Sequence, residues 1–102
     1  MKYYIHWLTL AELTFLDEID FILRKWNTNG VEKFTILVYS FIDALSQNPT
    51  IGKYSPKRKI YSLVISKQTT LYYNVLKDKK QINLVLFWNN KQNPSLLNKL
   101  LR

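Results

Sequence analysis

The spacing of apolar residues changes once along this chain, from helix-like in the first half to strand-like in the second. Between residues 9 and 48, apolar residues recur three or four positions apart, which is typical of amphipathic helices. Between residues 60 and 88, three short runs rich in β-branched and aromatic residues are separated by short polar pieces, which indicates a meander of antiparallel strands. A chain with this order is expected to fold as an α+β protein, with helices packed on a sheet.

The first half predicts one strand and two helices. Residues 3–8 suit a strand, and Thr9 and Glu12 then have the spacing of a capping box that opens a helix. The buried stripe of this helix is expected to be Phe15, Leu16, Ile19, Ile22, Leu23 and Trp26, with Asp17, Glu18, Asp20, Arg24 and Lys25 on the solvent side. The polar stretch 27–30 ends the helix, and a second amphipathic helix is expected to follow and to stop before Pro49.

The second half predicts a loop, three strands and a short helix. Residues 50–59 are basic and turn-like, so they are expected to form a connecting loop. The expected strands are residues 60–66, 69–77 and 81–88. Pro94 then opens a short amphipathic helix. The expected fold is a single domain over residues 1–102: an α+β protein of two layers, with an N-terminal strand, a helical hairpin, a three-stranded antiparallel meander and a C-terminal helix.

The sheet is expected to carry apolar residues on both faces. One face should meet the helical hairpin, because its two apolar stripes need a surface to cover them. The other face should bear some of Tyr61, Tyr72, Tyr73, Phe87 and Trp88. A face this apolar is a candidate surface for a protein partner.

Charge is divided sharply along the chain. Six of the seven acidic residues lie before residue 44, whereas eleven of the fifteen Lys and Arg residues lie after it. The formal net charge is +8, so the second part of the chain is strongly cationic. Such a surface attracts polyanions, which makes a nucleic acid or an acidic protein the expected partner. A charge that only keeps the protein in solution is the alternative.

Composition excludes several kinds of chemistry. The chain has no cysteine, which excludes disulfides, thiolate metal sites and a cysteine nucleophile. His6 is the only histidine and no acidic cluster suggests a magnesium site, so no metal or other cofactor is expected. His6 also lies far in sequence from the basic loop, so we expect it to have a structural role. No run is long enough to cross a bilayer and no signal peptide is evident, so a cytoplasmic protein without membrane contact is expected.

Three short motifs, in this order, resemble the RelE/ParE superfamily of toxins from bacterial type II toxin–antitoxin systems. Residues 48–52 are similar to the family's turn after the second helix, and residues 65–73 resemble its central hairpin. Residues 86–94, Leu-Phe-Trp-Asn-Asn-Lys-Gln-Asn-Pro, resemble the end of its last strand, where an arginine is usual at the position of Lys91. The resemblance covers nearly the whole chain and agrees with the predicted order of elements.

The resemblance implies a cognate antitoxin as partner, which silences the toxin by wrapping an extended, amphipathic and often acidic segment around it. It also implies one of two targets. RelE-like members act on the ribosome and cut messenger RNA, whereas ParE-like members inhibit DNA gyrase without nuclease chemistry. A toxin-derived module that has lost its activity and only binds is the third possibility.

Messenger RNA cutting in this family implies attack of a ribose 2′-hydroxyl on the neighbouring phosphate. Such a reaction needs a proton acceptor, a proton donor and cations that stabilise the crowded charge. The candidate catalytic residues are Lys57, Arg58, Lys59 and Lys91, and the candidate nucleic-acid-binding residues are these four together with Lys53 and Lys67. We expect Lys53, Lys57, Arg58, Lys59 and Lys91 to converge at one end of the sheet; a basic rim that contacts only the antitoxin is the alternative. The antitoxin-binding candidates are Tyr61, Tyr72, Tyr73, Phe87 and Trp88.

The sequence departs from the nucleases of the family near its C-terminus. Several of them have a Tyr or a His–Tyr pair there, but residues 95–102 contain neither. Lys91 cannot make the planar bidentate contact with phosphate that arginine makes. Tyr72 and Tyr73 are the candidate replacements as proton donors, with core packing as their alternative role. The cluster of cations and the family resemblance favour a ribosome-dependent endoribonuclease, whereas these departures leave the gyrase inhibitor and the inactive module open.

Overall fold

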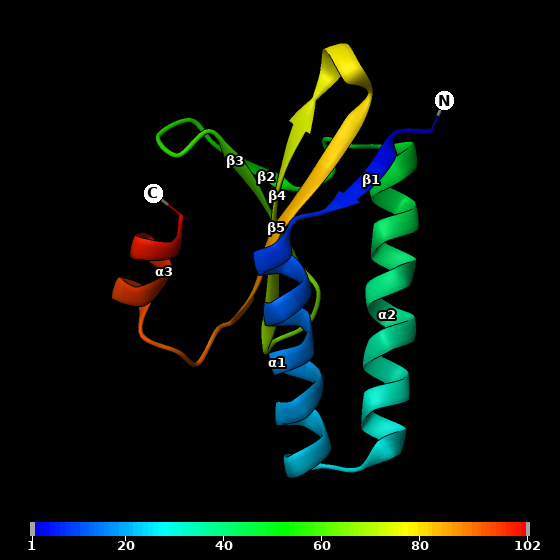
Figure 1. The fold of residues 1–102 in the computed structure, drawn as a ribbon, viewed down its shortest axis with the longest axis vertical. Helices are drawn as coiled ribbons and strands as arrows, with labels where there is room; N and C mark the ends of the chain where they lie inside the picture. The colour runs from blue at the N-terminus through cyan, green and yellow to red at the C-terminus, as the bar shows by residue number, and fades with distance from the viewer. Residues whose placement is uncertain (1, 102) are drawn as a thin grey trace.

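A five-stranded sheet separates two long helices from one short helix in this computed structural model, which describes residues 2–101 (Figure 1). The elements are β1 (Tyr4–Trp7), α1 (Thr9–Lys25), α2 (Thr28–Gln47), β2 (Lys53–Ser55), β3 (Ile60–Val64), β4 (Thr69–Leu76), the 3-10 turn η1 (Lys77–Lys79), β5 (Gln81–Asn89) and α3 (Pro94–Leu100). The predicted α+β class, the helical hairpin and the meander of β3, β4 and β5 are confirmed.

The sheet is larger than the sequence predicted. Its strand order is β1-β5-β4-β3-β2, with β1 parallel to β5 and all other pairs antiparallel. The prediction of a plain loop over residues 50–59 is wrong at Lys53–Ser55, because these residues pair with β3 as an edge strand. Three residues are too few to show the alternation that identifies a strand, so only the pairing with β3 reveals it.

Helix α1 begins without the predicted capping box. Leu8 is its N-cap in an extended conformation, and no side chain caps the helix. The reason lies in the sheet: the Leu8 amide is still bonded to the Leu84 carbonyl at 3.1 Å, so the chain passes directly from β1 into the helix. The polar stretch after α1 begins the next helix, because the Asn27 side chain accepts a hydrogen bond from the Gly30 amide at 3.1 Å and caps α2.

A β-bulge in β5 determines which residues face the helices. Tyr73 is paired with Leu84 and Tyr72 with Leu86, which leaves Val85 as an extra residue. The extra residue reverses the alternation along the second half of β5. Phe87 therefore turns toward the helices, whereas Leu86 faces α3.

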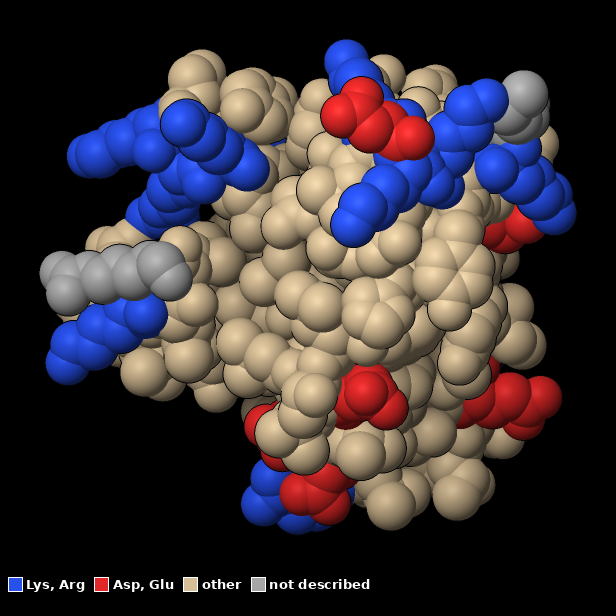
Figure 2. All heavy atoms as spheres, turned by 45° about the horizontal axis from the view of Figure 1, so that its top comes forward, with Lys and Arg blue, Asp and Glu red and all other residues tan. Residues whose placement is uncertain are grey.

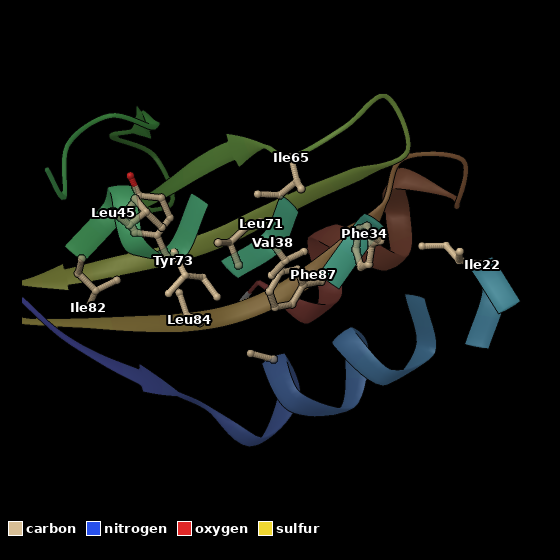
Figure 3. Close-up of a cluster of buried hydrophobic side chains, with 12 residues drawn as sticks. Ile22, Phe34, Val38, Leu45, Ile65, Leu71, Tyr73, Ile82, Leu84 and Phe87 are labelled. Atoms are coloured by element: carbon tan, nitrogen blue, oxygen red, sulfur yellow. The ribbon is translucent and has the colours of Figure 1, made fainter. Parts of the chain in front are cut away.

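The main core lies between the helical hairpin and the sheet (Figure 3). Val38 and Leu45 of α2 are fully buried there, and they pack in one cluster with Leu71 and Leu84 of the sheet. A smaller core lies on the other face, where Leu97 of α3 packs with Leu86 and Trp88. We call the face that carries α3 the outer face of the sheet.

Candidate nucleic-acid interface

Positive charge is concentrated at one end of the molecule. Figure 2 shows Lys and Arg gathered mainly in its upper half, at the end formed by the β2–β3 and β4–β5 turns, with most Asp and Glu in the lower half. The β4–β5 turn also carries Asp78, between Lys77 and Lys79. The β2–β3 turn carries three consecutive cations and no acid, so it is the stronger candidate for contact with a polyanion.

The β2–β3 turn fixes its backbone while it leaves its charges in solvent. The amide of Lys59 donates to the Ser55 carbonyl at 2.7 Å, and the amide of Arg58 donates to Ser55 Oγ at 3.3 Å. Lys59 has a φ of 57°, a left-handed conformation that closes the turn. The side chains of Lys57, Arg58 and Lys59 are all exposed. The turn therefore presents three cations from a defined backbone.

Arg58 also reaches the short C-terminal helix. Its guanidinium donates a hydrogen bond to Asn98 Oδ1 in α3. Helix α3 is held against the sheet by Leu97, and Lys99 adds a further cation in its last turn. The hydrogen bond between Arg58 and Asn98 thus connects the basic turn to α3, and both lie over the outer face of the sheet.

Tyr72 lies on the outer face below the basic turn and α3. It pairs with Ser62 of β3 and Leu86 of β5, and it packs against the small core under α3. Burial raises the pKa of Tyr72 above its ordinary value, and the positive charge of Arg58 acts in the opposite direction. The phenol is therefore protonated at neutral pH and can donate a proton or a hydrogen bond beside Arg58.

Lys53 belongs to the same row of side chains. It pairs with Ser62, and Ser62 pairs with Tyr72, so all three residues point to the outer face. We call Lys53, Arg58 and Tyr72, with Lys57 and Lys59 at the rim, the outer-face site.

The loop that carries Lys53 is anchored by Tyr73. This fully buried tyrosine donates a hydrogen bond to the Pro49 carbonyl at 2.9 Å and accepts one from the Gly52 amide at 3.0 Å. A Cβ on Gly52 would lie 2.6 Å from the Tyr73 hydroxyl and 2.7 Å from the Ser62 carbonyl oxygen, so only glycine fits this approach. Tyr73 therefore positions β2, and its hydroxyl is enclosed by the loop rather than open to a substrate.

The structure does not bring Lys91 and Lys67 to the outer-face site. Strand β5 leaves the sheet where β4 begins, since Asn89 pairs with Thr69. The β2–β3 turn lies at the other end of β3, because antiparallel pairing places Ile60 away from that edge. The expected convergence of Lys91 with Lys53 and the cations of the β2–β3 turn is wrong, because it depends on strand direction, which the sequence pattern does not specify.

The aromatic residues predicted to bind an antitoxin are divided between the two faces. Tyr73 and Phe87 are buried against the helices, and Tyr61 packs on the same side between Tyr54 and Tyr73. Trp88 faces outward, but α3 covers it and leaves it 5% exposed. Tyr72 alone among the five predicted residues is half-buried on the outer face.

Sequence reasoning missed a buried carboxyl group at the end of the sheet where Lys91 lies. Glu18 was expected on the solvent side of α1, but it is 4% exposed. Its carboxyl oxygens accept hydrogen bonds from Thr69 Oγ1 at 2.5 Å and Asn89 Nδ2 at 3.2 Å. Burial raises the pKa of Glu18, and the hydrogen bonds partly oppose this. The signal was its helical spacing with Ala11 and Ile22, both buried on this helix.

Asn89 connects the buried Glu18 carboxyl to the backbone of Lys91. The Asn89 Oδ1 atom accepts a hydrogen bond from the Lys91 amide at 3.0 Å. The buried Glu18 therefore fixes the backbone from which the Lys91 side chain extends. The Lys91 side chain lowers the pKa of Lys25 of α1, because a hydrogen bond between the two amines requires one of them to be neutral and because two positive charges repel each other.

His6 lies apart from the outer-face site. It is exposed on β1, at the opposite edge of the sheet from β2, and stacks with Tyr4 at 6.4 Å between ring centroids. Within residues 2–101, no three His, Cys, Asp or Glu side chains come together in a way that could hold a metal ion. None of the helices described is both long and apolar enough to span a membrane.

The described chain has a helical hairpin on one face of a sheet ordered β1-β5-β4-β3-β2, with a basic turn and a short helix on the other face. The chain is similar to a chain in the crystal structure of the toxin–antitoxin complex RelBE2 from Mycobacterium tuberculosis, with a TM-score of 0.63 and 14% identity. The similarity covers 88% of this chain and 100% of that chain, and it shows a shared fold. No protein-family model and no curated protein matches the sequence.

Proposed function

We propose that this chain is the toxin of a type II toxin–antitoxin system, and that it inhibits growth by cutting messenger RNA on the ribosome. The grouping of Arg58 with a protonated Tyr72 and with Lys53 on the outer face carries this proposal. The RelE-like fold supports it, and so does a net charge of +8, which suits a polyanionic target.

The residues of the outer-face site match the parts that the reaction needs. The 2′-hydroxyl of a ribose attacks the adjacent phosphorus and loses its proton, while the bond to the 5′-oxygen of the next nucleotide breaks. Arg58 and Lys53 stabilise the negative charge that builds up on the phosphate oxygens. Tyr72 protonates the departing 5′-oxygen, and the 2′-proton passes to solvent water at the rim, where the positive charges of Lys57 and Lys59 stabilise the negative charge that the proton leaves behind.

Lys91 and Lys67 take a different role in this proposal. Both lie at the opposite end of the sheet from the β2–β3 turn, so we assign them to binding of the RNA strand rather than to cleavage. The predicted Lys91 contribution to catalysis is thereby replaced by a binding contribution.

The antitoxin is proposed to cover the outer-face site. An acidic segment there would neutralise Arg58 and the two rim lysines and would contact Tyr72, which is half-buried. Tyr73 and Phe87 are excluded from this contact, because both are buried in the helix-facing core.

Purified chain added to ribosomes programmed with a defined messenger tests the proposal. The expected result is new messenger ends that depend on the ribosome and disappear when an antitoxin is added. Uncut messenger at a concentration that stops translation would contradict the proposed chemistry.

Inhibition of DNA gyrase is the second candidate function. It is favoured by the separation of Lys91 from the outer-face site and by residues 95–102, which hold neither Tyr nor His. A supercoiling assay with purified gyrase separates the two functions, since a gyrase inhibitor blocks supercoiling and leaves messenger intact. A chain that is inactive in both assays and harmless when expressed in a bacterial host would be a binding module.

A further inference from the structure

A hollow lined by two lysines lies at the opposite end of the molecule, where α1 turns into α2. This hollow of about 640 Å³ opens between the C-terminus of α1, the N-terminus of α2 and the β3–β4 turn. Figure 1 shows the helical turn at the lower end of the molecule. We call this hollow the turn groove. Its lining includes Lys25, Trp26, Lys33, Asn29, Ser66 and Gln68. The lining includes two lysines and, among the described residues, no carboxylate.

Two lysines lie at the edge of this groove. Lys25 lines it, and Lys91 follows Asn90, whose amide donates to the Gln68 carbonyl on the groove wall. The nearness of Lys91 lowers the pKa of Lys25. The salt bridges found within residues 2–101 join Lys2 to Asp43 and Arg24 to Asp20, so neither lysine has a carboxylate partner there. An anion between the two ammonium groups would replace their repulsion with two attractive contacts.

An exposed tryptophan adjoins the lysine pair. Trp26 is 63% exposed, whereas Trp88 is 5% exposed. The Lys25 ammonium lies 5.7 Å from the centre of the Trp26 ring, so the aromatic surface and the positive charge form one patch. A large indole left in solvent beside cations is a platform on which a nucleic-acid base can stack.

The remaining wall of the groove has a fixed position. The Asn90 amide donates to the Gln68 carbonyl at 2.6 Å, and Asn90 Nδ2 donates to the Lys67 carbonyl at 3.2 Å. These bonds attach the end of β5, which carries Lys91, to the β3–β4 turn. The backbone next to Lys91 and the polar wall of the groove are thus held together before any ligand binds, which lowers the entropic cost of binding.

We propose that the turn groove binds single-stranded nucleic acid, with a phosphate between Lys25 and Lys91 and a base stacked on Trp26. Lys33 faces the next phosphate, and the side chain of Asn29 offers hydrogen bonds to the edge of the base. The groove is separate from the outer-face site and does not depend on whether that site cleaves RNA, so binding and cleavage can be measured independently.

The charge part of the proposal is tested by binding of fluorescein-labelled hexauridylate to the whole chain, followed by fluorescence anisotropy at several salt concentrations. Lys25→Ala combined with Lys91→Ala is expected to weaken binding at least tenfold and to reduce the slope of log affinity against log salt by about 0.7, because the one phosphate between the two lysines is no longer bound. Lys77→Ala with Lys79→Ala removes the same charge at the other end of the molecule, and is expected to weaken binding less than threefold. Equal losses in the two double variants would overturn the proposal.

The stacking part is tested with Trp26→Ala and Trp26→Phe. The alanine variant is expected to bind hexauridylate about tenfold more weakly, because it removes one stacked base, whereas the phenylalanine variant keeps most of the affinity. Circular dichroism of each variant checks that the exposed substitution leaves the fold intact. Unchanged binding by Trp26→Ala would overturn the proposal and would make the groove a protein contact.

The nature of the strand is read from two further probes. Hexathymidylate that binds within threefold of hexauridylate assigns the groove to single strands of either kind, and clearly tighter binding of hexauridylate assigns it to RNA. A short DNA duplex that binds as tightly as hexauridylate would overturn the proposal, because paired bases cannot stack on Trp26.

Discussion

The guanidinium of Arg58 donates a hydrogen bond to Asn98 Oδ1, and this contact joins the basic β2–β3 turn to the C-terminal helix across forty residues of sequence. It defines the outer-face site, because α3 forms one wall and the turn forms the other. Tyr72 lies between them on the sheet, where the charge of Arg58 acts on its phenol. The contact therefore links the last helix, which also covers Trp88, to the chemistry proposed for the sheet.

Removing the charges of the β2–β3 turn should abolish messenger cutting while the fold remains. The suitable variant combines Lys57→Ala, Arg58→Ala and Lys59→Gly, because glycine adopts the left-handed conformation of residue 59 without strain. Exposed charges contribute little to stability, so the free energy of unfolding should change by no more than about 1 kcal/mol. Mapping of messenger ends and urea unfolding measure the two effects. Full cutting by this variant would place the active surface elsewhere.

Tyr72→Phe should separate proton donation from packing. The ring stays in the small core under α3, but the hydroxyl is lost, so cleavage should slow by about 10²–10⁴-fold if Tyr72 is the general acid. Single-turnover cleavage on ribosomes measures the rate. Tyr54→Phe is the matched control, since Tyr54 is exposed on β2 and should cut at the normal rate. Equal rates for the two variants would remove Tyr72 from the mechanism.

Glu18→Gln should change how stability depends on pH. The folded pKa of Glu18 is raised above its ordinary value of 4.5, so the unfolded chain loses this proton at lower pH than the folded chain does. The Glu18 contribution to stability is therefore fully present below pH 4.5 and is lost as pH rises through the folded pKa. Relative to the wild type, Glu18→Gln should become more stable as pH rises from 4 to 7. Urea unfolding at each pH measures this difference; a constant difference, or one of opposite sign, would contradict it.

Gly52→Ala should destabilise the protein by about 1–3 kcal/mol. The new methyl group would collide with the Tyr73 hydroxyl and the Ser62 carbonyl, and neither can move without breaking the attachment of the loop before β2. Gly30→Ala is the control, because its methyl group meets side-chain carbons of Ile22 and Trp26 at 3.1 Å and 3.3 Å within a helix that favours alanine. Thermal unfolding of both variants should show the larger loss for Gly52→Ala. Equal midpoints would mean that the loop relaxes freely.

Local patterns were sufficient to predict most elements of this fold. The helical hairpin, the meander of β3 to β5 and the short helix after Pro94 were all predicted, because helical periodicity, alternation and turn residues are properties of consecutive residues. The same patterns failed at β2, whose three residues become a strand only by pairing with β3. They also failed at Glu18, because its charge suggested the solvent side although its spacing with Ala11 and Ile22 indicated the buried stripe.

The amino-acid sequence by itself determined the class of fold, the division of charge and the three adjacent cations of the β2–β3 turn. The tertiary structure alone decided which of the candidate residues meet. Strand order and direction placed Arg58 beside Tyr72 and Asn98, and sent Lys91 to the other end of the sheet beside Lys25. The bulge at Val85 decided that Phe87 faces the helices. The physical reason is that hydrogen bonds and packing between segments far apart in the chain decide which side chains lie close together. Periodicity within one segment does not encode these contacts.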